Sequence, residues 1–511
     1  MKSLYAPAVV VLGLLIFGAP TINPDAMEMV DVGRCVLGFS AKDVACESLD
    51  LWAYPPLFSV LSALLSVVFG PWAAAAMMGP IGAALLVLPM GLLAQRLTGR
   101  MAFGFAVALL VFLPVLRFYG TTADPRLACI AMVAWAWWIL WMGESGRSRS
   151  LFMVGILVGL SVLTRPEGIV HAALVVGVAV VLKRARALWV VLGAGTLIVP
   201  YLGLLSLRLG TWVVSPRSWE LRGVGLLEVL PVRWLIQLWG VGATRPPFRD
   251  WLEQSTSSGG VESGTVLSSL FSVLRILMTA IPLELHLLAL GGVVLVVMQR
   301  CCRRTMAVLV LLCVPALAVS FSPMGLDLGM PLKNLLAVVV VEAVLASAFL
   351  GWVCVRLGPR LKRFFQAGQP LSRQKAQALQ EVAVGGGLVL VLGMIWLPRG
   401  YLENRFWPGM SEETERAAEW LAQNTAPSDR VGSSFGSGPV ARRAGRMRVT
   451  IPSPWEIQSW SDKRVRPQWL VVTALDGIWP LKSNDLHDAV TLEPAAFFST
   501  DHGWAMVLKV R

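Results

Sequence analysis

The chain has 511 residues, of which 56% are hydrophobic and only 15% are charged, and its formal net charge is +13. Soluble domains carry roughly 25% charged residues, so this composition excludes an ordinary soluble enzyme. The basic residues stand between apolar runs rather than in one polar domain. This distribution excludes nucleic acid as a partner and is typical of the charge bias that orients membrane proteins. We expect an α-helical polytopic membrane protein in contact with membrane lipids.

Apolar runs recur along most of the chain, and many are long enough to cross a hydrocarbon core of about 30 Å. We predict about eleven transmembrane helices, at residues 4–20, 72–94, 101–118, 125–142, 151–163, 168–182, 187–207, 282–298, 305–321, 331–353 and 382–397. The first is interpreted as a retained span, because Lys2 precedes it and no small-residue cleavage site follows. The run PPLFSVLSALLSVVFG (55–70) is predicted to be an interfacial helix. Counting it as a span would place the basic connections AQRLTGR and GESGRSRS outside the membrane.

Basic residues fall in alternate connections between these runs. They are Arg96 and Arg100; Arg147 and Arg149; Lys183, Arg184 and Arg186; Arg300, Arg303 and Arg304; and the basic run 356–375. Basic connections face the cytoplasm in membrane proteins. We therefore predict a multi-pass protein of the cell inner (plasma) membrane, with a cytoplasmic N-terminus and an external C-terminus.

Three of the predicted outward connections carry charge at the membrane boundary. They contain Asp25, Asp124, and the pair Arg165 and Glu167 in the turn LTRPEG (163–168). The simplest interpretation of these two residues is a helix end, where they are paired with each other or with water. Pro166 would start the next helix, and Glu167 in its first turn would favour the dipole. That interpretation explains the local chemistry but not the recurrence of acids on one face.

The last segment changes composition. Residues 1–397 form the predicted transmembrane domain, whereas residues 398–511 are polar. In this segment we predict a capped amphipathic helix from Ser411 and strands at 468–475 and 504–511. At about 110 residues, it is large enough for its own core. We expect a small α/β extracytoplasmic domain.

Histidine and cysteine indicate no metal centre. The four histidines are scattered, without the paired spacing of metal ligands. His171 and His286 lie in apolar runs and are interpreted as satisfied core histidines. Cys35 and Cys46 share the first outward connection and could form a disulfide in an oxidising compartment.

Four stretches of the first half of the chain carry a family resemblance. PDAMEMVDVGRCVLG, YPPLFSVLSALLSVVFG, TADPRLACIAMVAWAWW and GILVGLSVLTRPEGI are similar, in order and spacing, to the polytopic glycosyltransferases with the GT-C fold. The nearest branch contains protein-mannosyltransferase-like and lipid A aminoarabinose-transferase-like enzymes. The resemblance covers residues 1–200 and is weaker to about residue 400.

The resemblance implies that a sugar passes from a polyprenyl-phosphate carrier to an acceptor outside the membrane, where the acceptor is a glycan, a lipid or a protein. Asp25 matches the essential aspartate of the family's first outer loop, and Asp124 matches an acid in the next. Both are candidate catalytic residues. The family often has a second acid directly after the first; here Ala26 follows Asp25, and Glu28, one turn on, compensates in part.

The carrier phosphate needs a cation. Many family members place Lys or His before PPL, whereas this chain has Tyr54, a hydrogen-bond donor without charge. Lys333, Arg165 and the arginines of the long outer loop (208–266) are therefore candidates for the phosphate. Tyr54 and Glu167 complete the predicted substrate-binding set. A divalent metal held by carboxylates would serve the same purpose, but no metal ligands are identified.

Two other function classes stay open. A transporter or flippase of lipid-linked sugars would show two similar halves and charges near the midplane. A surface-polysaccharide ligase or polymerase would use the same donors. The acidic first loop and the run PPL…FG favour the glycosyltransferase.

Overall fold

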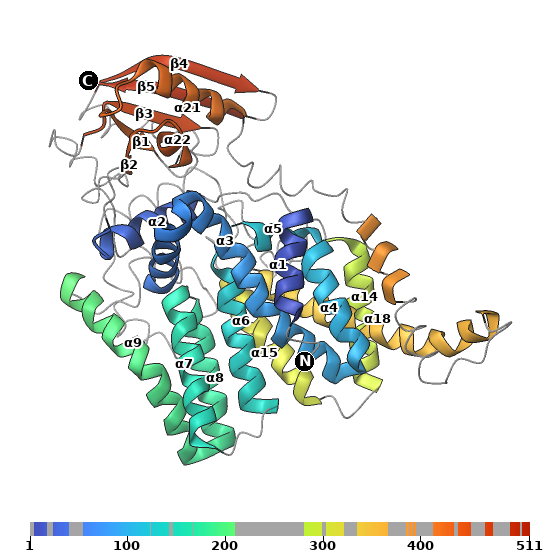
Figure 1. The fold of residues 1–511 in the computed structure, drawn as a ribbon. Coiled ribbons are helices and arrows are strands. Elements are labelled where there is room, and N and C mark those ends of the chain that lie inside the picture. The colour runs from blue at the N-terminus through green and yellow to red at the C-terminus, as the bar shows by residue number, and fades with distance from the viewer. Residues whose placement is uncertain are drawn as a thin grey trace, which may run out of the picture. The chain divides into compact units, whose positions relative to one another are not determined.

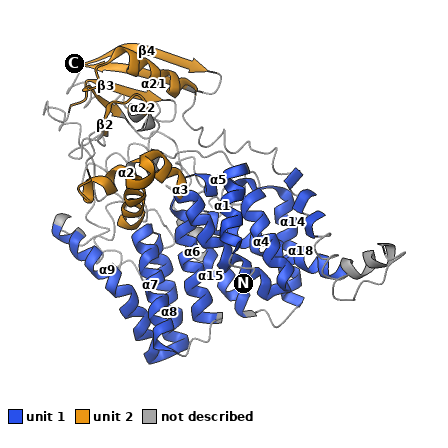
Figure 2. Cartoon of the chain, viewed as in Figure 1, with its two compact units in different colours: residues 1–20, 78–243, 261–406 blue, residues 21–77, 244–260, 407–511 orange. Residues whose placement is uncertain are grey.

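The structure is a computed structural model that describes most of the chain. The described residues are 5–17, 24–39, 55–122, 124–142, 147–165, 167–209, 281–298, 303–320, 335–365, 385–387, 389–391, 393–394, 412–433, 438–450, 466–473, 491–500 and 503–511. The chain forms two compact units (Figure 2). Unit 1 comprises residues 1–20, 78–243 and 261–406, and unit 2 comprises residues 21–77, 244–260 and 407–511. The predicted domain boundary at residue 397 stays a prediction.

Unit 1 is built from helices (Figure 1). They are α1 (Ala6–Phe17), the second half of α3 (Pro56–Thr98), α4 (Arg100–Phe112), α5 (Pro114–Thr121), α6 (Arg126–Trp137) with the π-helix η3 (Trp138–Met142), α7 (Ser148–Thr164), α8 (Gly168–Lys183), the 3-10 turn η4 (Arg184–Ala187), α9 (Leu188–Leu209), α14 (Leu283–Met298), α15 (Arg303–Ser320) and α18 (Leu336–Phe365). Each predicted span between residues 4 and 353 falls on helix. The predicted span 382–397 lies largely outside the described residues.

Several of these helices can cross a membrane. By length and composition, three stretches of the described residues qualify: Pro56–Thr98, Gly168–Leu204 and Leu336–Arg356. Helices α4 and α5 would make a fourth if the bent pair is one span. Shorter apolar helices of 10–17 residues accompany them. The helices support a membrane protein, and the count of eleven spans stays a prediction.

The predicted continuous span 101–118 is wrong. Helix α4 ends at Phe112, and α5 starts at Pro114 with its axis bent by 67°. Leu113 between them is extended, with φ −66° and ψ 119°. Proline lacks the N–H that would continue the helix, and it disfavours a helical backbone in the preceding residue.

The predicted interfacial helix 55–70 and the predicted span 72–94 form one element, α3, with a break inside it. Gly70 has φ 80° and ψ 161°, which is not a helical backbone. This positive φ is available to glycine without the steric cost that a side chain brings. The sequence therefore located the break correctly.

Helices α7 and α9 run parallel and pack closely. A Cβ on Gly155 would meet Val190, and one on Gly159 would meet Leu197. Residue numbers thus rise in the same direction along both helices, as they do in a parallel pair. Helix α8, which joins α7 to α9 along the chain, must therefore run in the opposite direction. The chain reverses at η4, where Arg184 has φ 48°. The stretch from α8 to α9 is therefore two antiparallel helices rather than one long span (Figure 1).

Helix α6 connects this group to α3. It runs parallel to the second half of α3, because Gly82 lies against Ala128 and the Arg96 guanidinium lies 5.6 Å from the centre of the Trp138 ring. It starts beside the last turn of α7, where Thr164 donates to the Met132 sulfur at 3.7 Å.

Charged residues in the connections from α3 to α9 consequently gather at two ends of the helices. The basic end holds Arg96, Arg100, Arg147, Arg149, Lys183, Arg184 and Arg186. The opposite end, here called the Asp124 end, holds the α5–α6 and α7–α8 turns with Asp124, Arg126, Arg165 and Glu167. The alternation that the basic connections predicted is therefore present in these helices.

Unit 2 begins with α2 (Pro24–Val36), which packs on the first half of α3. Gly33 lies so close to the Ser59 carbonyl that a Cβ would not fit. Met27 and Val30 are buried, and so is Asp31. Cys35 is disulfide-bonded to a residue outside those described, so its pairing with Cys46 stays a prediction.

The C-terminal part of unit 2 is an α/β layer. Its elements are α21 (Glu412–Asn424), β1 (Arg430–Ser433), α22 (Gly438–Arg443), β2 (Met447–Thr450), β3 (Trp469–Thr473), β4 (Leu492–Thr500) and β5 (Gly503–Val510). The strand order is β2-β1-β3-β5-β4. Strands β2, β1 and β3 are parallel, whereas β5 is antiparallel to both β3 and β4.

One face of this sheet is covered by α21. Ala417 and Leu421 of α21 are fully buried in one cluster with Val431, Val471 and Val507 of the strands. The predicted helix and both predicted strands are confirmed, with the helix starting at Glu412. Helix α22 packs against α2, so the C-terminal segment contacts the helix that carries Asp25.

The close packing of α7 on α9 gives a stability test. A Cβ on Gly155 would lie within 3.0 Å of the α9 backbone, so Gly155→Ala must separate the helices and should cost about 1–3 kcal/mol. Gly177→Ala on α8 is the matched control, because a Cβ there meets nothing within 4 Å. Removing this glycine should stabilise α8 by up to about 1 kcal/mol. Thermal unfolding in detergent measures both, and equal melting temperatures would contradict the α7–α9 contact.

Candidate functional site at the Asp124 end

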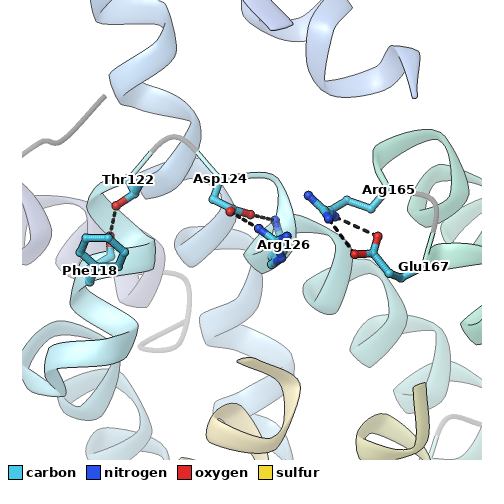
Figure 3. A network of polar contacts seen from close by, with 6 residues as sticks. All are labelled: Phe118, Thr122, Asp124, Arg126, Arg165 and Glu167. Atoms are coloured by element: carbon cyan, nitrogen blue, oxygen red, sulfur yellow. Dashed lines mark hydrogen bonds and ion pairs between the residues drawn. The ribbon is translucent and has the colours of Figure 1, made fainter. Parts of the chain in front are cut away.

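Asp124 lies in the turn before α6 and is 3% exposed. Its Oδ1 accepts a hydrogen bond from the Arg126 backbone N–H at 2.8 Å, and its Oδ2 forms an ion pair with the Arg126 guanidinium (Figure 3). The first N–H groups of a helix have no acceptor within it, and Asp124 accepts one of them. Both carboxylate oxygens are thus held by Arg126.

Two neighbouring elements fix the backbone of this turn. Thr122 ends α5 by donating its hydroxyl to the Phe118 carbonyl at 2.6 Å. Gly79 of α3 lies against the Thr122 carbonyl, with no room for a side chain. Thr122, just before Asp124 in the chain, is therefore held both by its own helix and by α3.

Arg165 and Glu167 form a second pair in the α7–α8 turn. The Arg165 Nε donates to Glu167 Oε2 at 2.9 Å, and its Nη2 donates to Oε1 at 2.6 Å. The side chains are 13% and 20% exposed. The predicted pairing of the two residues is therefore confirmed, and it is bidentate, the strongest arginine–carboxylate geometry. The next helix starts at Gly168 rather than at Pro166, so Glu167 precedes its first turn.

The two pairs lie side by side (Figure 3). The start of α6 and the end of α7 are in contact here, where the Cys129 thiol approaches the Ser161 carbonyl at 3.7 Å. The charge of Arg126 also acts on Glu167. Two guanidinium groups and two carboxylates therefore share one small region at the Asp124 end.

Burial alone would raise the pKa of Glu167. The charge and hydrogen bonds of Arg165, assisted by Arg126, outweigh this effect and lower the pKa to about 2. Glu167 is therefore ionised at neutral pH and holds the Arg165 guanidinium in place.

The other predicted site residues are only partly covered. Asp25 lies in the first turn of α2, which starts at Pro24. Its side chain is outside those described, as are Tyr54 and Lys333. Nothing here brings these three together with the Asp124 pairs, and their roles stay predictions.

Among the charged residues that sequence reasoning did not single out are Arg126 and Asp31. Arg126 directly follows the ADP sequence of the α5–α6 turn, and its position next to a proposed catalytic acid was the available signal. Asp31 is fully buried in α2. Asp25, Glu28 and Asp31 are three residues apart in the sequence, a spacing that places acids on one face of a helix. This spacing was the available signal for Asp31.

The described residues do not fit a metal. No three or more histidines, cysteines or acids among them are grouped to hold an ion. The carboxylate of Asp124 is taken up by Arg126. We therefore assign no step to a metal.

Comparison with solved structures identifies the architecture. The structure of ArnT from Cupriavidus metallidurans in the apo state superposes with a TM-score of 0.55 at 14% identity, covering 99% of this chain and 97% of that chain. Its complex with undecaprenyl phosphate gives a TM-score of 0.54. The chain has the GT-C fold.

A second similar structure is the archaeal oligosaccharyltransferase AglB from Archaeoglobus fulgidus, in complex with an inhibitory peptide and a dolichol-phosphate. It shows a TM-score of 0.54 and 13% identity, with coverage of 99% of this chain and 74% of that chain. No protein-family model matches the chain, and no curated protein matches it by sequence. The fold expected from the four GT-C-like stretches is confirmed.

The depressed pKa of Glu167 gives a pH test. A carboxyl whose pKa is lower in the folded state stabilises the fold above its unfolded pKa of about 4.3, and this contribution is lost as the pH falls from about 5 to about 2. At pH 7 Glu167→Gln should therefore cost about 3 kcal/mol. The difference from wild type should shrink by pH 3.

Thermal unfolding in detergent at both pH values measures this difference. Glu412→Gln is the control, because Glu412 forms an exposed i,i+4 ion pair with Arg416 that is worth about 0.5 kcal/mol or less. A Glu167→Gln penalty that does not change between pH 7 and pH 3 would show that the ion pair is not its cause.

Proposed function

We propose that this chain is a membrane glycosyltransferase that moves a sugar from a polyprenyl-phosphate carrier to an acceptor on the outer face of the cytoplasmic membrane. The GT-C fold carries the proposal, because structures of that fold with TM-scores of 0.54 hold undecaprenyl phosphate in ArnT and a dolichol-phosphate in AglB. The acceptor is a glycan, a lipid or a protein.

The Asp124 end supplies what such a donor requires. The carrier tail lies in the bilayer while its phosphate stays at the boundary, so a cation must be available where helices end. Arg165 stands at such a point, and its planar guanidinium suits phosphate. Lys333 and Tyr54 are proposed as further contacts to the carrier, and Glu167 orients Arg165.

The reaction needs a base as well as a cation. The acceptor oxygen or nitrogen attacks the anomeric carbon, the bond from that carbon to the phosphate oxygen breaks, and the phosphate leaves with the electron pair. The acceptor proton passes to a carboxylate. We assign this role to Asp25. Asp124 is the second candidate; as a base it would have to release Arg126, and it is better suited to holding that guanidinium near the leaving phosphate.

The orientation is part of the proposal. The basic end of unit 1 faces the cytoplasm, with the N-terminus on that side, and residues 398–511 lie outside. The disulfide at Cys35 supports an oxidising surrounding for the first loop. A transporter would need polar groups near the middle of its spans, whereas Asp124–Arg126 and Arg165–Glu167 both lie where helices begin or end.

Substitution of Asp25 tests the proposed chemistry. Asn is close to Asp in shape and changes a helix first turn by about 0.3–1 kcal/mol, but it cannot accept the acceptor's proton. Asp25→Asn should therefore lose about 10²–10⁴-fold in transfer rate, with an unchanged melting temperature. The assay is sugar transfer by the purified chain in proteoliposomes, with a panel of polyprenyl-phosphate sugars and candidate acceptors.

Two further variants sharpen this assay. Lys333→Gln should raise the KM for the donor more than it lowers kcat, because its proposed contact is to the carrier phosphate. Glu415→Gln, on the exposed face of α21, should transfer at the wild-type rate. Full activity of Asp25→Asn would remove this residue from the mechanism and leave Asp124 as the base.

A further inference from the structure

The sheet of unit 2 exposes two aromatic rings at one edge. Phe497 of β4 is 58% exposed, and Trp504 of the neighbouring strand β5 is half-buried. Their rings stack, with centroids 6.3 Å apart and planes inclined by 29°. Strand β4 is the last strand on this side of the described sheet. The two rings therefore form one apolar surface at the open edge of the sheet.

Both rings lie on the sheet face that points away from α21. Their neighbours along the strands pack in the cluster beneath α21; these are Ala496, Phe498 and Ala505. Successive side chains of a strand point to opposite faces of the sheet. Phe497 and Trp504 therefore point away from the helix that covers the other face.

The strand register places polar groups beside the rings. Ser499 follows Phe497 by two residues, so it lies on the same face, and it pairs directly with Trp504. The Ser499 hydroxyl donates and accepts hydrogen bonds, and the Trp504 indole N–H donates one. Met506 pairs with Phe497 across the two strands. We call the side chains of Phe497, Ser499, Trp504 and Met506 the Phe497 surface.

The Phe497 surface is too small for a bilayer or a protein partner. Among the described residues of the C-terminal α/β layer, Phe497 is the one large apolar side chain that is exposed. Helix α9 of unit 1, by contrast, exposes a series that includes Leu188, Val199 and Leu207. A stable protein interface buries about 800 Å² on each partner around an apolar core. A single exposed ring with polar groups beside it suits a smaller ligand.

A sugar ring has the complementary chemistry. The face of an aromatic ring is electron-rich. The axial C–H groups of a pyranose gather on one side of the sugar and are weakly positive, so that side stacks on an aromatic ring. The hydroxyl groups around the sugar form hydrogen bonds, for which Ser499 and Trp504 offer partners. The Phe497 surface therefore matches both the apolar side and the polar rim of a sugar.

The Phe497 surface lies far from α2 within unit 2. Helix α22 packs against α2, which carries Asp25, and against β1 and β2. Strand β4 stands at the opposite edge of the sheet from β2, in the order β2-β1-β3-β5-β4. Neighbouring strands are about 4.8 Å apart, so the two edges are separated by about 19 Å. A sugar bound here is consequently not the one at which transfer takes place.

We propose that the Phe497 surface binds a sugar ring of the acceptor, and that the acceptor is therefore a glycan several sugars long. This inference rests on the proposed function and deepens it, because that proposal leaves glycan, lipid and protein acceptors open. No bond is made or broken at the Phe497 surface. It holds a distant unit of the glycan while another unit of the same glycan receives the new sugar.

Binding of oligosaccharides to the full chain in lipid nanodiscs tests this site. Nanodiscs replace detergent here, because the head groups of maltoside detergents are themselves sugars. The probes are immobilised oligosaccharides of glucose, galactose, mannose and N-acetylglucosamine. Wild type should bind at least one of them, and Phe497→Ala should bind it about tenfold less tightly or worse. Phe497→Tyr keeps the ring and should bind like wild type.

Glu493→Gln is the matched control on the same strand. Glu493 forms an exposed ion pair with Arg511 at 2.9 Å and lies outside the Phe497 surface, so oligosaccharide binding should not change. Equal binding by wild type and Phe497→Ala would overturn the inference, and so would the failure of wild type to bind any probe. Both results leave the proposed function standing, since sugar transfer is assayed separately.

The transfer assay gives a second readout. With a glycan acceptor, Phe497→Ala should raise the KM for that acceptor, because the lost contact is to a distant unit of the glycan. The kcat and the KM for the polyprenyl-phosphate donor should match those of wild type. An increase in the donor KM instead would place Phe497 in donor binding and overturn the inference.

A photocrosslinker identifies the occupant directly. A benzophenone amino acid replaces Phe497 and is irradiated in nanodiscs with the oligosaccharide that binds best, and mass spectrometry identifies the attached molecule. Attachment of the oligosaccharide is the expected result. Attachment of a lipid or of a second copy of the chain in its place would show a membrane contact or a self-association surface, and would overturn the inference.

Discussion

The constraint on which this structure depends is that charged side chains are costly within hydrocarbon. From α3 to α9 the described helices alternate in direction, and the charged residues of their connections lie at the two ends. Arginine and lysine connections gather at the basic end, whereas the acids stand with arginine partners at the Asp124 end. If such a chain needs charged residues to act on a lipid-linked donor, those residues are therefore restricted to the positions where helices begin or end.

Close helix packing holds the charged residues of the Asp124 end in fixed positions. Glycines at positions 79, 82 and 155 let backbones approach where a side chain would not fit. They fix α3 against the α5–α6 turn and α7 against α9, and the contact between Cys129 and Ser161 joins the two turns. The result is a preorganised group of two guanidinium–carboxylate pairs. Preorganised charge is the feature that stabilises a leaving phosphate most effectively.

The sequence predicted the parts of the fold that follow from periodicity and charge. The helix positions between residues 4 and 353 are present, except that the span 101–118 is broken. The alternation of basic connections up to Arg186, the pairing of Arg165 with Glu167 and the C-terminal helix and strands are also present. The bend at Leu113 was missed because the span was predicted from the continuous apolar run alone. Pro114, which lacks the N–H that would continue the helix, was the available signal. The parallel order of β2, β1 and β3 depends on pairing between distant segments, which local patterns do not specify.

The site was harder to predict than the fold. Arg126 and Asp31 were overlooked because each is one of many charged residues in the sequence, and only burial distinguishes them. The prediction that His171 is a satisfied core histidine is wrong, because its buried Nδ1 has no hydrogen-bond partner among the described residues. An apolar run could not show this, since a partner on another helix would leave the same sequence. What a sequence alone can show is where a charge must be tolerated; which groups satisfy it depends on tertiary contacts.

The central claim is that the Asp124 end faces the outer side of the membrane, where a lipid-linked donor is used. Reporter fusions along the chain test it most directly. Fusions at Gly99, Arg147 and Arg184 should report the cytoplasm, and fusions after Gly400 should report the outside. An external signal at Arg147 would place the basic end outside and the Asp124 end in the cytoplasm, which would contradict the account.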